Sequence, residues 1–201
     1  MTVIQWGLAG LFGLAAWQRF RVEGREHHGA RRGVVRDAWT GYAMVTLHVL
    51  TYMLTAIETS IRWARHAMDP RMAGMGLSLF LAGFLLRRWA IRTLGPYWSL
   101  QIEIRPDQPV MCGGPYRWMR HPNYLALMLE VVGLPLAGQA FWTILPVLRG
   151  YYPLILLRLF CEERALLASV PQYRHYQQGS GTFWPGPAWL RTRRQRDSRK
   201  F

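Results

Sequence analysis

The residues best suited to chemistry lie in the segment Gly113–Tyr124, which has the sequence GGPYRWMRHPNY. Pro122 is well placed as the first residue of the apolar helix that follows, so His121 is expected near the N-cap. A helix start presents unpaired N–H groups and the positive end of the helix dipole, to which Arg117 and Arg120 add two guanidinium groups. The segment therefore predicts an anion site. An interfacial loop whose arginines contact lipid phosphates is, from this segment alone, an equally good interpretation.

A second candidate is the adjacent carboxylate pair Glu162 and Glu163, in a chain with only 11 acidic residues. The pair is expected to follow directly on the end of an apolar helix. Carboxylates at a helix C-terminus oppose the dipole, so they are unfavourable there unless they have a partner or a function. The structural alternative is an ion pair with Arg158 or Arg164.

Tyr173 and Tyr176 follow in the segment PQYRHY. Their spacing of three places them on one side if the segment is helical. Carboxylates and aromatic rings together can hold a sulfonium, by charge attraction at one face and by cation–π contact at another.

Ionisable residues also occur within or at the ends of apolar stretches. Such groups are costly in a membrane and mark functional sites by default. On this ground Arg87, at the end of the third stretch, is expected to mark a functional site. The residues predicted to contact a substrate are Glu58, Arg88, Trp89 and Glu130.

Five apolar stretches predict an all-α integral membrane protein with about five transmembrane helices. They are Val3–Phe20, Trp39–Ile61, Met72–Leu86 with a helical continuation to about Leu94, Tyr124–Gly138 and Phe141–Phe160. Crossing a bilayer takes about 20 mostly apolar residues. The fourth stretch is short and contains Pro135, so it is expected to form a tight hairpin with the fifth. The first has no basic residue before it and no cleavage site after it, so it is interpreted as a retained span.

The 25 basic residues, all arginine except Lys200, give a net charge of +14 and alternate along the chain. Six lie between Arg19 and Arg36, three between Arg62 and Arg71, six between Arg87 and Arg120, one at Arg149, and nine from Arg158 onward. Since basic loops stay in the cytoplasm, the first loop, the loop Arg87–Arg120 and the tail are predicted to be cytoplasmic, in a bacterial inner membrane. A soluble nucleic-acid binder has no reason for this alternation. The basic tail is expected to lie near anionic lipid headgroups.

Together the two polar segments resemble the isoprenylcysteine carboxyl methyltransferase family. Its members share a GPYR-x-x-RHP-x-Y segment and, one helical hairpin later, an EE-x-x-L segment followed by spaced tyrosines. Here these are Gly114–Tyr124 and Glu162–Leu166, and the resemblance extends from about Arg87 to Pro185. It implies S-adenosylmethionine in a cytoplasmic pocket of the carboxyl-terminal half, closed over by the tail, with a lateral opening for a lipophilic acceptor.

The resemblance also implies roles for individual residues. Arg87, in LRRWAIRTLG, matches a family arginine at the reaction centre, and Glu163 would be its catalytic partner for protons or for the sulfonium. The residues expected to bind the cofactor are Tyr116, Arg117, Arg120, His121, Pro122, Asn123, Tyr124, Glu162, Glu163, Tyr173 and Tyr176. No metal site is expected. One departure is the segment LLASVPQY, which lacks the FG-x-x-Y pattern usual in the family and leaves the roles of the two tyrosines open.

A narrower resemblance concerns the acceptor. The segments QRFRVEGREHHGA, GYAMVTLHVL and HPNYLALMLEVVGLPL look like bacterial members associated with type III polyketide synthases. Those members O-methylate phenolic lipids such as alkylresorcinols or alkylpyrones, so that reaction is the first hypothesis, with a possible pathway link to such a synthase. Carboxyl methylation of an isoprenylcysteine-type substrate is the second. A non-catalytic membrane scaffold or lipid-binding protein is the alternative of another class.

The expected organisation is a single membrane methyltransferase domain over residues 1–201. Residues 1–86 would supply the amino-terminal membrane helices, 87–190 the cofactor-binding catalytic half, and 191–201 the basic tail.

Overall fold

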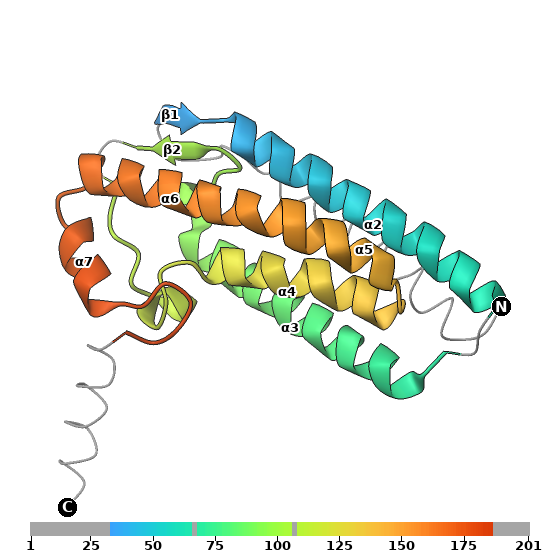
Figure 1. The fold of residues 1–201 in the computed structure, drawn as a ribbon. Coiled ribbons are helices and arrows are strands. Elements are labelled where there is room, and N and C mark those ends of the chain that lie inside the picture. Colours follow the sequence, from blue (N-terminus) through green and yellow to red (C-terminus); the bar gives the residue numbers. More distant parts are fainter. Residues whose placement is uncertain (1–32, 66–67, 106–107, 187–201) are drawn as a thin grey trace, which may run out of the picture.

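The computed structural model describes residues 33–65, 68–105 and 108–186, and these are mostly helical. The helices are α2 (Trp39–Arg65), α3 (Pro70–Leu94), α4 (Pro122–Ala137), α5 (Phe141–Pro146), α6 (Tyr152–Ser169) and α7 (Tyr173–Gly179). The longer helices run roughly along one direction, and α7 lies at one end of them (Figure 1). The helical membrane architecture predicted from the apolar stretches is confirmed.

Three of the helical segments in the described residues are long and apolar enough to cross a bilayer: Trp39–Ala64, Pro70–Tyr97 and Phe141–Ser169. The third is continuous because α5 passes through a π-helical turn, Val147–Tyr151, into α6. With 16 residues, α4 is shorter. The stretch Val3–Phe20 and the tail 191–201 lie outside the described residues, so the count of five spans stays a prediction.

The predicted hairpin between the fourth and fifth stretches is confirmed. After α4 the chain turns through Gly138, Gln139 and Ala140 into α5. Gln139 has a φ of 54° and its side-chain amide donates to the carbonyl of Asp69 at 2.8 Å. This bond ties the turn to the start of α3.

The expectation that the fifth apolar helix ends before the glutamate pair is wrong. The helix continues to Ser169, so Glu162 and Glu163 lie within α6 with six further helical residues after them. The physical reason is that the segment EERALLA consists of strong helix formers, so the helix persists beyond the apolar run. It stops at Val170, whose extended backbone precedes Pro171.

Close packing of α3 on α4 depends on glycines. A Cβ on Gly133 would lie 2.5 Å from the backbone nitrogen of Phe80, and one on Gly83 would lie 2.7 Å from the carbonyl oxygen of Ala126. On Gly76 it would meet the backbone of Ala137 at 2.1 Å. Small residues that let helix backbones approach are the usual basis of helix association in membranes.

A two-stranded ribbon was not predicted. Strands β1 (Val34–Asp37) and β2 (Ile102–Ile104) pair antiparallel, with Val34 opposite Ile104 and a register shift between Val35 and Asp37. The ribbon lies at the same end of the helices as α7 (Figure 1). This end contains the site.

Glycine packing between α3 and α4 can be tested with a matched pair of alanine substitutions. Gly133→Ala should lower the free energy of unfolding by about 1–3 kcal/mol because the added methyl overlaps the backbone of α3. Gly74→Ala, where an added Cβ meets nothing within 4 Å, should leave stability unchanged or raise it slightly, since alanine is the better helix former. Thermal unfolding in detergent measures both, and equal melting temperatures for the two variants would contradict the packing model.

Candidate functional site

A cavity lies at the end of the helices where α7 and the ribbon gather. Its walls come from α2, α3, α4, α6 and α7, from the turn that precedes α4, and from residues 97–104 and 108–111. Nine of the predicted site residues line it, and they come from segments far apart in the sequence. They are Arg87, Tyr116, Arg120, His121, Asn123, Tyr124, Glu162, Tyr173 and Tyr176.

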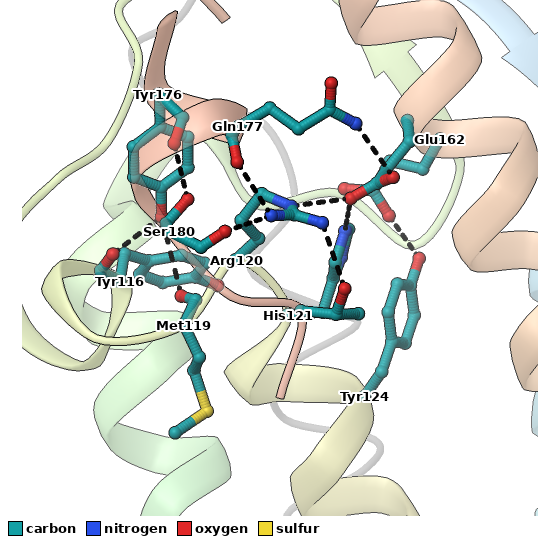
Figure 2. Close-up of polar contacts among 11 residues, drawn as sticks. Tyr116, Met119, Arg120, His121, Tyr124, Glu162, Tyr176, Gln177 and Ser180 are labelled. Carbon is teal, nitrogen blue, oxygen red and sulfur yellow. Dashed lines mark hydrogen bonds and ion pairs between the residues drawn. The ribbon is translucent and has the colours of Figure 1, made fainter. Parts of the chain in front are cut away.

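The Arg120 guanidinium is the hub of the polar network (Figure 2). Its Nε donates to Glu163 Oε1 at 2.7 Å, and its Nη1 donates to the carbonyl oxygens of Gln177, at 3.1 Å, and Ser180. Its Nη2 donates to the hydroxyl of Thr182 at 2.9 Å. One planar side chain therefore holds α6, α7 and the segment after α7 against the start of α4, which a single ammonium group could not do.

His121 strengthens the same junction. It precedes Pro122, the first residue of α4, as predicted. Its ring Nε2 lies 3.0 Å from Glu163 Oε1, and its backbone N–H donates to the carbonyl of Thr182 at 3.1 Å. The anion predicted for this helix start is thus supplied by the chain itself. The two polar segments of the sequence meet, and the partner of Glu163 is Arg120 rather than Arg158 or Arg164.

The two glutamates have different surroundings. Glu162 lines the cavity and accepts a hydrogen bond from the Tyr124 hydroxyl. Glu163 uses one carboxylate oxygen for Arg120 and His121 and receives the Gln177 amide on the other at 3.2 Å. Glu162 is therefore the carboxylate available to a molecule in the cavity, while Glu163 fixes the groups around it.

Arg158 is a functional candidate that the sequence interpretation missed. It is buried and lines the cavity, with its Nε donating to the Tyr124 hydroxyl at 3.1 Å. Its Nη1 donates to the Thr40 hydroxyl at 2.8 Å and its Nη2 to the carbonyl of Leu100. These partners are all uncharged, so Arg158 brings positive charge to the wall. Its position in an apolar helix was the available signal.

The tyrosines of α7 share one side, as their spacing predicted, with ring centroids 5.8 Å apart. The Tyr176 hydroxyl donates to the carbonyl of Tyr116 at 2.6 Å. Burial raises the pKa of Tyr176 to about 12, and burial together with the charges of Glu163 and Glu162 raises the pKa of Tyr173 further. Both phenols are neutral at physiological pH, so they offer the cavity aromatic faces rather than charge.

Two buried polar atoms on residues lining the cavity have no hydrogen-bond partner within the described residues. They are Arg87 Nε and Asn123 Oδ1. Leaving such groups unpaired costs free energy, so each calls for an explanation, and a catalytic role is one of those recognised. Another nitrogen of the same guanidinium, Arg87 Nη1, lies 3.4 Å from Glu130 Oε2. Two cavity-lining residues therefore each keep the capacity for one further hydrogen bond, Arg87 as a donor and Asn123 as an acceptor.

The remaining predicted residues lie outside the cavity lining. Glu58 lies 18 residues further along α2 than Thr40. At a rise of 1.5 Å per residue, the two residues are about 27 Å apart along the helix axis. The Glu58 carboxylate accepts from the backbone N–H groups of Trp142 and Thr143, at the start of α5. The others are held by local contacts: Trp89 packs edge-on against Trp118, Arg88 and Arg117 lie over the rings of Phe84 and Trp118, and Pro122 is buried at the start of α4.

Part of the cavity wall had no counterpart in the sequence prediction. Residues 97–104 and 108–111 form one side, and Gly41 and Met44 of α2 contribute as well. The alternation Ile102–Glu103–Ile104, buried at both isoleucines, was the available signal for a strand here.

Arg120→Lys tests whether the guanidinium holds the segment after α7. The lysine retains one charge but cannot reach α6, α7 and residues 180–182 together, so we expect amide hydrogen exchange in residues 180–186 to rise at least tenfold. Arg117→Lys is the control, since the Arg117 guanidinium lies over the Trp118 ring at 4.2 Å and is not part of this network. Unchanged exchange in Arg120→Lys would contradict the assignment.

Comparison with known proteins identifies a family and several relatives that resemble this chain. The model of the isoprenylcysteine carboxyl methyltransferase family matches residues 76–168. An uncharacterised protein of Bacillus subtilis, YpbQ, is 30% identical over 124 residues, which cover 61% of this chain and 71% of that protein.

Two relatives with informative names also match. The protein-S-isoprenylcysteine O-methyltransferase of Tribolium castaneum is 30% identical over 154 residues, 70% of this chain and 48% of that protein. The cobalt-zinc-cadmium resistance protein CzcN of Cupriavidus metallidurans is 24% identical over 143 residues, 68% of this chain and 60% of that protein. With its helical membrane architecture and its two interlocked polar motifs, the chain belongs to the isoprenylcysteine carboxyl methyltransferase family.

Proposed function

We propose that this membrane methyltransferase transfers the methyl group of S-adenosylmethionine to a carboxylate oxygen of a lipophilic acceptor of the isoprenylcysteine type. The observation that carries the proposal is the cavity in which a buried arginine, Arg87, shares the wall with Glu162 and the tyrosines of α7. Family membership supports methyl transfer. The name of the Tribolium relative supports the acceptor class.

The polar side of the cavity suits S-adenosylmethionine, which supplies an electrophilic methyl on a sulfonium. Asn123 Oδ1 can accept a hydrogen bond from an amino group, since it has no partner within the described residues. The carboxylate of Glu162 and the neutral rings of Tyr173 and Tyr176 offer charge attraction and cation–π contact to a cation. Arg158, whose partners are uncharged, offers a guanidinium group to a carboxylate.

Arg87 suits the acceptor. It lines the cavity together with the apolar side chains of Met44 and Leu127, so a lipophilic molecule with a polar end can place that end at the guanidinium. A carboxylate is ionised at neutral pH, whereas a phenol with a pKa near 10 must first lose its proton. In an in-line displacement the arginine need only orient the oxygen, and positioning of this kind supplies much of the rate.

The phenolic lipid hypothesis is less well supported. None of the relatives named above points to phenolic lipids or to a polyketide synthase, so carboxyl methylation replaces phenol methylation as the preferred reaction. A non-catalytic scaffold is separated from both by titrating S-adenosylmethionine into the purified protein, because a scaffold would show no saturable binding.

The proposed location follows from the arginines. Their concentration in alternate loops favours a bacterial inner membrane with the cavity on the cytoplasmic side, where S-adenosylmethionine is made. Membrane lipids surround the apolar helix faces, and the acceptor enters from among them.

Alanine substitutions at Arg87 and Glu163 test the site. Arg87→Ala removes the group that orients the acceptor, and Glu163→Ala releases Arg120 and His121, so each should lower turnover at least 100-fold. Arg92→Ala, an exposed arginine in the last turn of the same helix as Arg87, is the control and should retain near-normal turnover. Labelled methyl transfer measures all three, and near-normal activity of Arg87→Ala and Glu163→Ala would refute the assignment.

Side-by-side acceptor assays test the substrate class. With labelled S-adenosylmethionine, a farnesylcysteine analogue should be methylated and an alkylresorcinol should not. The chemical lability of the product distinguishes a methyl ester from a methyl ether, since mild base hydrolyses only the ester. Label in the alkylresorcinol alone would restore the phenolic lipid hypothesis.

A further inference from the structure

Behind Arg87 a chain of buried polar side chains runs across the apolar interior. Arg87 Nη1 lies 3.4 Å from Glu130 Oε2, and the same oxygen lies 3.8 Å from His48 Nε2. His48 Nδ1 in turn lies 2.9 Å from the Tyr151 hydroxyl, and its ring packs edge-on against Tyr52. Each of Arg87, Glu130 and His48 exposes 5% or less of its side chain.

The chain joins helices rather than neighbours in sequence. Arg87 comes from α3, Glu130 from α4, His48 from α2 and Tyr151 from the π-helical turn before α6. Only Arg87 among these four reaches the cavity lining. The other three lie behind the cavity lining.

Burying these groups has a cost that packing alone does not explain. A carboxylate and a guanidinium in an apolar bundle are expensive, and apolar residues of similar size would give equal or greater stability. What the ion pair adds is orientation. A long arginine side chain has many rotamers, and a carboxylate on one edge of its planar fork restricts them and leaves the other edge for a ligand.

From this arrangement we infer that Glu130, with His48 beside it at 3.8 Å, is a positioning residue that aims the Arg87 guanidinium at the acceptor. Glu130 fixes Nη1, and Nε, which has no partner in the described part of the chain, remains for the acceptor oxygen. The inference rests on the proposed function and extends it to two residues that touch neither cofactor nor acceptor.

Glu130→Gln tests the inference, because the amide keeps the shape but loses the charge that holds Arg87. We expect kcat/KM for the farnesylcysteine analogue to fall roughly 10- to 100-fold, as misplaced catalytic groups do. The Kd for S-adenosylmethionine and the melting temperature should change little. Asp69→Asn is the matched carboxylate-to-amide control, since asparagine can still cap α3, and it should behave as wild type. Wild-type kcat/KM in Glu130→Gln would overturn the inference.

A double-mutant cycle separates positioning from a general loss of structure. If Glu130 acts through Arg87, Arg87→Lys combined with Glu130→Gln should lose less kcat/KM than the product of the single losses. Multiplicative losses would contradict the inference. If the wild type itself methylates no acceptor, the proposed function fails instead, so the two failures are distinguishable.

Two substitutions of His48 keep the inference testable even if Glu130→Gln does not fold. A glutamine amide can replace Nε2 and still reach Glu130, whereas an asparagine amide replaces Nδ1 and reaches only Tyr151. His48→Gln should therefore retain more kcat/KM than His48→Asn, with equal affinity for S-adenosylmethionine. Equal activity of the two, or the reverse order, would refute the role of His48.

Discussion

The ion pair between Arg120 and Glu163 is the interaction on which the site depends. It joins residues 43 positions apart, one at the start of α4 and one within α6, at 2.7 Å. The same guanidinium also binds α7 and the segment after it. The tyrosines of α7 and the basic residues of the cavity are therefore positioned by one side chain. The site therefore requires both motifs and forms only where they meet.

The membrane sets the second constraint. Helices in a bilayer associate through close packing and polar contacts rather than through the hydrophobic effect. Glycines at the α3–α4 contact provide the packing, and the Arg87–Glu130 pair bridges these same two helices at the level of the cavity. The contact that brings α3 and α4 together thus also places a charged group in the cavity wall.

Much of the architecture follows from sequence patterns. Apolar runs predicted α2, α3, the α4–α5 hairpin and most of α6, and Pro122 marked the start of α4, because length, hydropathy and proline act locally. The predicted end of α6 was wrong because the helix propensity of the following residues extended the helix past its apolar part. The ribbon escaped notice because a three-residue strand such as β2 has too short an alternation to stand out.

The site was predictable only as a set of residue types. Sequence indicated that Arg120, Glu162, Glu163 and Tyr176 belong together, but nothing in it said that Glu163 would be occupied by Arg120 while Glu162 faces the cavity. Arg158 was passed over because its partners, such as Thr40 and Leu100, come from distant elements and are neutral. Which side chain faces a cavity is decided by helix rotation, and packing sets that rotation.

The central claim is that the interlocked motifs enclose the S-adenosylmethionine site. The most direct measurement is an experimental structure of the protein in lipid with S-adenosylhomocysteine bound. The account predicts density for this nucleotide between Asn123, Glu162 and Tyr173, with Glu162 between the nucleotide and the membrane core. Density for it elsewhere on the protein, with this cavity filled by side chains, would contradict the account.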